Sequence, residues 1–102
     1  MGADRRKQKM ENPWPPERIK ALRRAFGETQ VEFARRLGIH PGSLGFWEQG
    51  TAPSSMAQAF LKLIEDTVDK KDLARARIEV EEEAIEEARA EAREEKKLSK
   101  AK

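Results

Sequence analysis

The residue types that could carry chemistry in this sequence are those of a binding surface. The 102 residues include one histidine and no cysteine, so a disulfide framework, a thiolate nucleophile and a zinc centre all lack their ligands. The sequence contains no Ser/His/Asp, Cys/His or phosphate-loop arrangement, and its glutamates fall in a helix-forming stretch without partner residues for acid–base chemistry. We therefore expect no enzymatic activity, no catalytic residue, no metal and no cofactor.

The charged residues are segregated along the chain. Residues 1–77 carry 15 Lys and Arg against 10 Asp and Glu, residues 78–95 carry 9 Glu against 2 Arg, and the last 7 residues carry 4 Lys. A basic first part suits the phosphates of nucleic acid, which repel an acidic segment. We expect nucleic acid to bind the first part of the chain only.

Residues 29–50 contain the elements that would position such a surface. Their sequence, TQVEFARRLGIHPGSLGFWEQG, predicts two short helices around a tight turn. Thr29 and Glu32 have the capping-box spacing that starts a helix. Gly38 suits the left-handed residue that ends this helix, and Pro41 suits the first turn of the next one. Helix, glycine-containing turn and helix together predict a helix-turn-helix.

A larger set of residues makes this pattern specific. The set is Gln30, Phe33, Ala34, Leu37, Gly38, Ile39, Leu44, Trp47, Glu48, Gly50 and Pro53. In type and spacing these residues resemble the phage Cro/repressor-type (XRE-like) helix-turn-helix family, over roughly residues 16–64. The resemblance implies an all-α, four-helix (lambda-repressor-like) domain. It also implies a sequence-specific transcriptional regulator that binds double-stranded DNA, a repressor acting as a homodimer on an inverted repeat.

The resemblance further implies which residues meet DNA. In the family, the glutamine at the position of Gln30 contacts the DNA backbone, where the free N–H groups of a helix start favour phosphate. The expected DNA-binding residues are Gln30, Arg35, Arg36, His40, Pro41, Gly42, Ser43, Phe46, Gln49, Arg18 and Lys20. Arg23 and Glu48 occupy positions that the family often joins as a structural ion pair.

The expected recognition helix departs from the usual chemistry of base contact. From residue 39 to residue 49 its only formal charge is Glu48, whereas Arg, Asn and Gln are the usual bidentate readers of bases. Phe46 could press on thymine methyls, and Ser43 could bond to several bases. Two alternatives stay open, namely a surface that meets another protein and specificity that comes from DNA shape.

The rest of the sequence divides the chain into three parts. Residues 1–12 predict a disordered basic arm, which either reaches along DNA or is a solvated tail. Residues 13–68 form the helix-turn-helix domain, with Trp14 as an anchor. Its last helix is expected to turn one apolar face inward, namely Ala57, Phe60, Leu61, Ile64 and Val68. Residues 69–102 predict a long charged C-terminal helix with a Lys-rich end.

The C-terminal helix carries a narrow apolar row, namely Leu73, Ile78, Ile85 and Ala92. We expect this row to form a homodimer or to bind a protein partner, the alternative being a solvated helix that frays. Many glutamates lie four residues apart, which destabilises an isolated helix, so a positive neighbour such as the basic domain should offset them. If the partner is another protein, the alternative function is an interaction module such as an antitoxin or a phage adaptor.

The sequence also bears on location. No apolar run approaches the length of a membrane span, and the first residues do not form a signal peptide. We expect no membrane association and a cytoplasmic protein, bacterial or phage-encoded and associated with the nucleoid.

Overall fold

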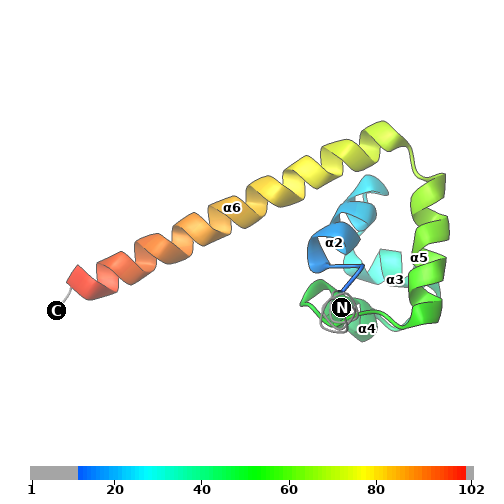
Figure 1. The fold of residues 1–102 in the computed structure, drawn as a ribbon, viewed down its shortest axis with the longest axis horizontal. Coiled ribbons are helices and arrows are strands. Elements are labelled where there is room, and N and C mark those ends of the chain that lie inside the picture. The colour runs from blue at the N-terminus through cyan, green and yellow to red at the C-terminus, as the bar shows by residue number, and fades with distance from the viewer. Residues whose placement is uncertain (1–11, 101–102) are drawn as a thin grey trace, which may run out of the picture.

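The computed structural model describes residues 12–100, which form five α-helices and, within that range, no β-strand (Figure 1). The helices are α2 (Pro16–Ala25), α3 (Gln30–Leu37), α4 (Pro41–Glu48), α5 (Ser55–Thr67) and α6 (Lys70–Lys100). The expected all-α fold, a helix-turn-helix domain followed by a long C-terminal helix, is confirmed. The predicted basic arm, residues 1–12, lies outside the described residues except for Asn12.

The start of α3 is held by the predicted capping box. The Thr29 hydroxyl accepts a hydrogen bond from the Glu32 N–H at 3.2 Å, and the Glu32 carboxylate accepts one from the Thr29 N–H at 2.9 Å. α3 ends at Gly38, whose φ of 72° lies in the left-handed region that favours glycine. The turn between α3 and α4 therefore has the geometry that the sequence predicts.

One apolar core joins α2, α3, α4 and α5. Its buried members are Trp14, Ile19, Leu22, Phe33, Ala34, Leu37, Leu44 and Leu61. Trp14 lies ahead of α2 and is 3% exposed, so it anchors the first segment of the domain as predicted. The helices of the domain are held mainly by this burial, because α3 and α4 are too short to be stable alone.

α5 turns a different face to the core than expected. Leu61 is buried and Ile64 packs beside the core, as predicted, but Phe60 is 42% exposed and the prediction was wrong there. The buried face instead includes Glu65, whose carboxylate pairs with Arg18. Phe60 instead lines a groove between α4 and α5, together with Trp47 and Met56.

The first half of α6 packs on α2. The residues buried between the two helices are Ala21, Leu73, Ala76 and Val80. Beside them the guanidinium of Arg24 donates hydrogen bonds to both carboxylate oxygens of Glu83. The basic helix α2 thus supplies the positive neighbour that the glutamate-rich helix was expected to need.

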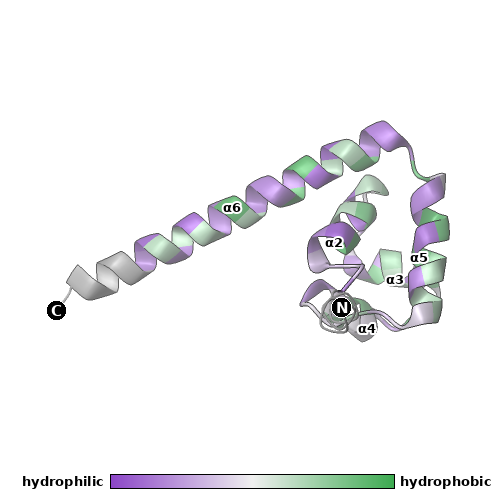
Figure 2. Cartoon of the chain, viewed as in Figure 1, coloured by the Kyte–Doolittle hydropathy of each residue, from purple (hydrophilic) through white to green (hydrophobic). Residues whose placement is uncertain are grey.

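Beyond its contact with α2, α6 continues as a single helix away from the domain (Figure 1). This part is mainly hydrophilic, with isolated apolar residues (Figure 2). Ile78 and Ile85 are 57% and 46% exposed. Leu73 lies about 140° around the helix from Ile78, at about 100° per residue, and is buried against α2. Its expected place in the dimer or partner row is therefore corrected, because it packs within the chain.

Candidate nucleic-acid interface

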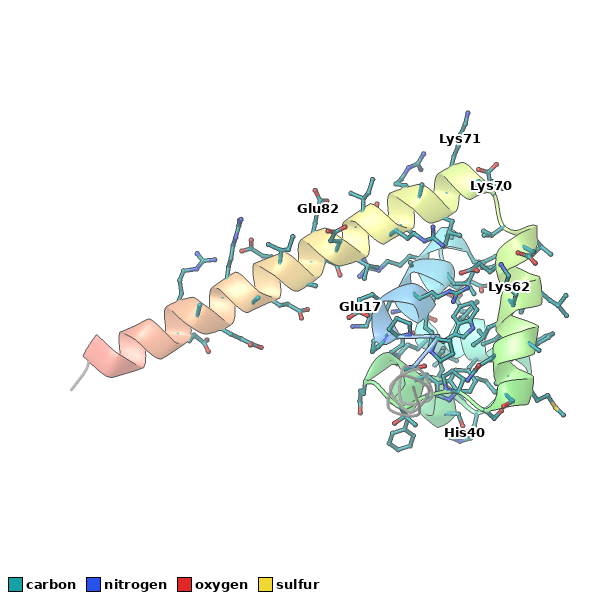
Figure 3. The ribbon with its side chains drawn as sticks, viewed as in Figure 1. Glu17, His40, Lys62, Lys70, Lys71 and Glu82 are labelled. Carbon is teal, nitrogen blue, oxygen red and sulfur yellow. The ribbon has the colours of Figure 1, made fainter. Side chains whose placement is uncertain are left out.

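α4 is buried on one side and open on the other. Leu44 and Glu48 are buried in the domain, and Trp47 packs beside the core. The exposed residues of α4 and its two ends are His40, Pro41, Gly42, Ser43, Phe46 and Gln49. These six residues, which we call the α4 surface, are the ones that the sequence analysis expects to face bases. α4 lies on the far side of α2 from α6, and His40 marks this end of the molecule (Figures 1 and 3).

His40 has a structural role at the start of α4. Its Nδ1 accepts a hydrogen bond from the Gly42 N–H at 3.0 Å and so caps the helix. Pro41 follows in the first turn, where its missing N–H leaves no helical hydrogen bond unmade. A neutral imidazole that accepts at Nδ1 carries its proton on Nε2. His40 therefore offers a single N–H donor to a ligand at the α4 surface.

An ion pair fixes α4 to α2. Nε and Nη2 of Arg23 donate to the Glu48 carboxylate at 2.8 and 3.1 Å, and the Glu48 side chain is only 3% exposed. The predicted pair is therefore present. Nε2 of Gln30 donates to the same carboxylate at 3.1 Å. Gln30, expected to contact the DNA backbone, thus helps to hold α4 in place.

The two arginines near the end of α3 differ in their surroundings. Arg36 donates two hydrogen bonds to the Glu28 carboxylate at 2.8 and 2.9 Å and lies 4.3 Å from the centre of the Phe26 ring. The hydrogen bonds lower the pKa of the Glu28 carboxyl and raise the pKa of Arg36. Arg35 is exposed, and no acidic partner lies within ion-pair distance among residues 12–94. Of the two, Arg35 is the more available to a phosphate.

Arg18 and Lys20 lie on the α5 and α6 side of α2, apart from the α4 surface. Nε and Nη2 of Arg18 donate to the two carboxylate oxygens of Glu65 at 3.0 and 2.8 Å. The pKa of the Glu83 carboxyl is lowered, chiefly by the hydrogen bonds from Arg24 and in part by the charge of Lys20. Both residues expected to meet phosphate are therefore placed beside carboxylates of α5 and α6.

The sequence interpretation missed the pair between Arg18 and Glu65. Glu65 follows the buried Leu61 by one helical turn and is itself 8% exposed. A carboxylate on that face needs a cation, because an unpaired buried charge is expensive. The hydrogen bond from Arg18, which also lies 3.7 Å from the centre of the Trp14 ring, lowers the pKa of the Glu65 carboxyl. The available signal was a glutamate in the middle of an apolar stripe.

A known protein family matches the region from α2 to α5. Residues 19–62 match the family described as Helix-turn-helix. No curated protein and no solved structure matches the chain. Across the described part of the chain, no three acidic or histidine side chains converge as metal ligands. None of the helices α2 to α6 has an apolar stretch long enough to cross a membrane.

Proposed function

Because residues 19–62 are a domain of the XRE/Cro-like helix-turn-helix family, which implies DNA binding, we propose that this chain is a sequence-specific transcriptional regulator. It acts as a repressor, and it binds an inverted repeat as a homodimer whose two-fold axis matches that of the site. α4 is the recognition helix of this function. α3 lies across the DNA backbone.

The observation that carries the proposal is that α4 is buried on one side and exposed on the other. Leu44 and the ion pair of Glu48 with Arg23 fix its inner side to the domain. The α4 surface is exposed along the whole helix. A short helix that is held rigidly on one side and open on the other suits insertion into the major groove.

The charges around α4 also support DNA binding. Arg35 is exposed at the end of α3, and Gln30 opens that helix, where free N–H groups favour phosphate. The acidic α6 lies on the far side of α2, so its glutamates are kept away from a duplex bound at α4 (Figure 1). This position argues against α6 as a cover of the recognition helix in the same chain.

The homodimer is assigned to the exposed row of α6. Ile78 and Ile85 are seven residues apart, as are Ile85 and Ala92, and all three are exposed. A seven-residue repeat keeps a seam on one side of a helix that pairs with another helix. The row lies on another face of α6 than Leu73, and Ile85 also lines a groove that α6 forms with Pro15 and Glu17 at the start of α2.

Duplex titration tests the DNA-binding function. Affinity for a duplex should fall steeply as salt rises from about 50 to about 200 mM, since phosphate contacts release counterions. Arg35→Ala should reduce the slope of log affinity against log salt by about one. Lys71→Ala is the matched control, because Lys71 is exposed at the start of α6, far from His40 (Figure 3). Absence of binding to any duplex at low salt would contradict the proposal.

A second candidate function rests on the free part of α6. Residues 84–94 are exposed throughout and include Ile85 and four glutamates. Such a helix fits a basic partner protein, as in an antitoxin or a phage adaptor. Sedimentation equilibrium of the isolated chain separates the two readings of the row. If the chain stays monomeric at high micromolar concentration and does not dimerise on any duplex, the result would favour the function in which α6 binds a partner protein.

A further inference from the structure

The α4 surface has a chemistry that selects one kind of base edge. We propose that it reads thymine C5-methyl groups through Phe46, so that the half-site is recognised by A·T pairs and not by guanine contacts. This inference rests on the proposed DNA-binding function. It goes further because it names the base atoms that decide where the protein binds.

The first argument is what the α4 surface lacks. No residue from Ile39 to Trp47 carries a formal charge, and the one charge at the end of the helix, Glu48, is buried in its pair with Arg23. Guanine is read in the major groove mainly by Arg or Lys at its O6 and N7 atoms. The α4 surface offers no such cation, so a guanine below the middle of α4 would leave both acceptors without a charged partner.

The second argument is the exposure of Phe46. Its side chain is 61% exposed near the middle of α4, whereas the next residue, Trp47, packs beside the core. The fold therefore gains little from the Phe46 ring. In the major groove the apolar feature is the C5-methyl group of thymine, and a phenyl ring is one of the side chains that bury it.

The third argument is Gly45, which the fold does not require. A Cβ built at this position would meet no atom within 4 Å, and its φ is not positive. Alanine would stabilise a helix at such a position. Gly45 follows Gly42 by three residues and precedes Gln49 by four, so the three lie along one side of the helix, beside Phe46. Two glycines in this row let the backbone of α4 approach a groove closely.

The remaining polar groups fit the same site. Gln49 can bond both N6 and N7 of adenine, the base paired with thymine. His40 contributes one Nε2–H donor, since its Nδ1 caps α4. The surface thus has an apolar centre for methyl groups and one amide at its end for adenine.

The experiment begins with selection of duplexes from a random-sequence pool by the full chain at moderate salt. The selected duplex is then made with deoxyuridine in place of thymidine, one position at a time, which removes only the C5-methyl group. At one or two positions per half-site the affinity should fall about fourfold. A fourfold change in affinity corresponds to about 0.8 kcal/mol, the free energy of burying about one methyl or methylene group, because 1.4 kcal/mol is a tenfold change in affinity.

Phe46→Ala supplies the second arm. This variant should bind the thymidine duplex more weakly and should no longer distinguish thymidine from deoxyuridine. Leu63→Ala is the matched control, because Leu63 is an exposed apolar residue of α5 that does not line the groove between α4 and α5, and it should keep the distinction. Replacing guanines by 7-deazaguanine, which removes N7, should change the affinity of the parent chain by less than about twofold.

The remaining outcomes would contradict either the reading of thymine or the DNA-binding function on which it rests. If the chain retains no duplex at low salt, the DNA-binding function itself fails, and Phe46 then belongs to a protein contact. Binding without enrichment of any sequence would leave the function standing and refute the reading of thymine. A deoxyuridine effect that persists in Phe46→Ala, or a large effect of 7-deazaguanine, would assign the discrimination to another residue.

Discussion

Arg23 of α2 holds both carboxylate oxygens of Glu48 at the end of α4, and the Glu48 side chain is almost fully buried. α4 is thereby attached to α2, which is itself packed between the core and α6. Removing one partner would leave the other charge desolvated, which costs more than the pair contributes when intact.

Glu48→Ala should therefore lower the free energy of unfolding by about 3 kcal/mol. Glu28→Ala, which breaks the more exposed pair with Arg36, should have a clearly smaller effect. Denaturant unfolding of both variants, followed by circular dichroism, measures the difference. Equal denaturant midpoints for Glu48→Ala and the parent chain would mean that the ion pair does not stabilise the packing of α4.

Acid should weaken the domain through Glu65. Its pKa is lowered from the ordinary value of 4.5, chiefly by the hydrogen bond from Arg18. The folded chain thus favours the ionised carboxylate, so this contribution is complete above about pH 4.5 and is lost as the pH falls through the lowered pKa. Glu65→Gln should unfold at a lower temperature than the parent at neutral pH.

The test is the melting temperature of Glu65→Gln measured from about pH 7 to about pH 3. It should depend less on pH than that of the parent. Glu82→Gln is the control, because Glu82 is exposed on the outer side of α6 (Figure 3), and it should reproduce the pH profile of the parent. A Glu65→Gln profile parallel to that of the parent would contradict the assignment.

Substitutions at two apolar residues of α6 should affect different properties of the chain, namely its stability and its self-association. Leu73→Ala removes packing against α2 and should cost about 2 kcal/mol of stability, at the low end for a large-to-small change because the site lies at the edge of a small cluster. Ile85→Ala should leave thermal stability of the monomer nearly unchanged but weaken self-association. Light scattering over a range of concentrations, together with thermal melts, separates the two effects.

Two glycines provide a matched pair of substitutions. Gly45→Ala should stabilise the domain by about 1 kcal/mol, since the new methyl group meets open space in a regular helix. At Gly38 the space is equally open, but φ is +72°. Gly38→Ala should therefore destabilise the domain by about 1 kcal/mol or more, because a Cβ is strained in the left-handed region. Thermal unfolding of the two variants should show shifts of opposite sign.

Local signals in the sequence predicted the domain well. The capping box of Thr29 and Glu32 and the left-handed Gly38 are present, because each depends on near neighbours. The pair of Arg23 with Glu48, which the family resemblance implied, is present as well. The α4 surface followed from the same spacing.

The packing of α6 could not be read in the same way. The seven-residue row of Ile78 and Ile85 was the stronger apolar signal, yet the helix packs on α2 through Leu73, Ala76 and Val80. Small side chains at this face let the two helices approach closely, and the ion pair across 59 residues of sequence adds to the contact. Neither feature is visible in the periodicity of α6 alone, since both depend on which face of α2 is left open by the core.

The length of α6 determines how a single molecule moves through solution. Its 31 residues, at about 1.5 Å each, make a rod of about 46 Å attached to a small domain. The radius of gyration is 16.7 Å, against about 13 Å for a compact chain of this size. The greater friction of such a shape makes a monomer elute early from a gel-filtration column, at the volume of a larger globular protein. Self-association of this chain must accordingly be judged by mass, from scattering or sedimentation equilibrium, and not by elution volume.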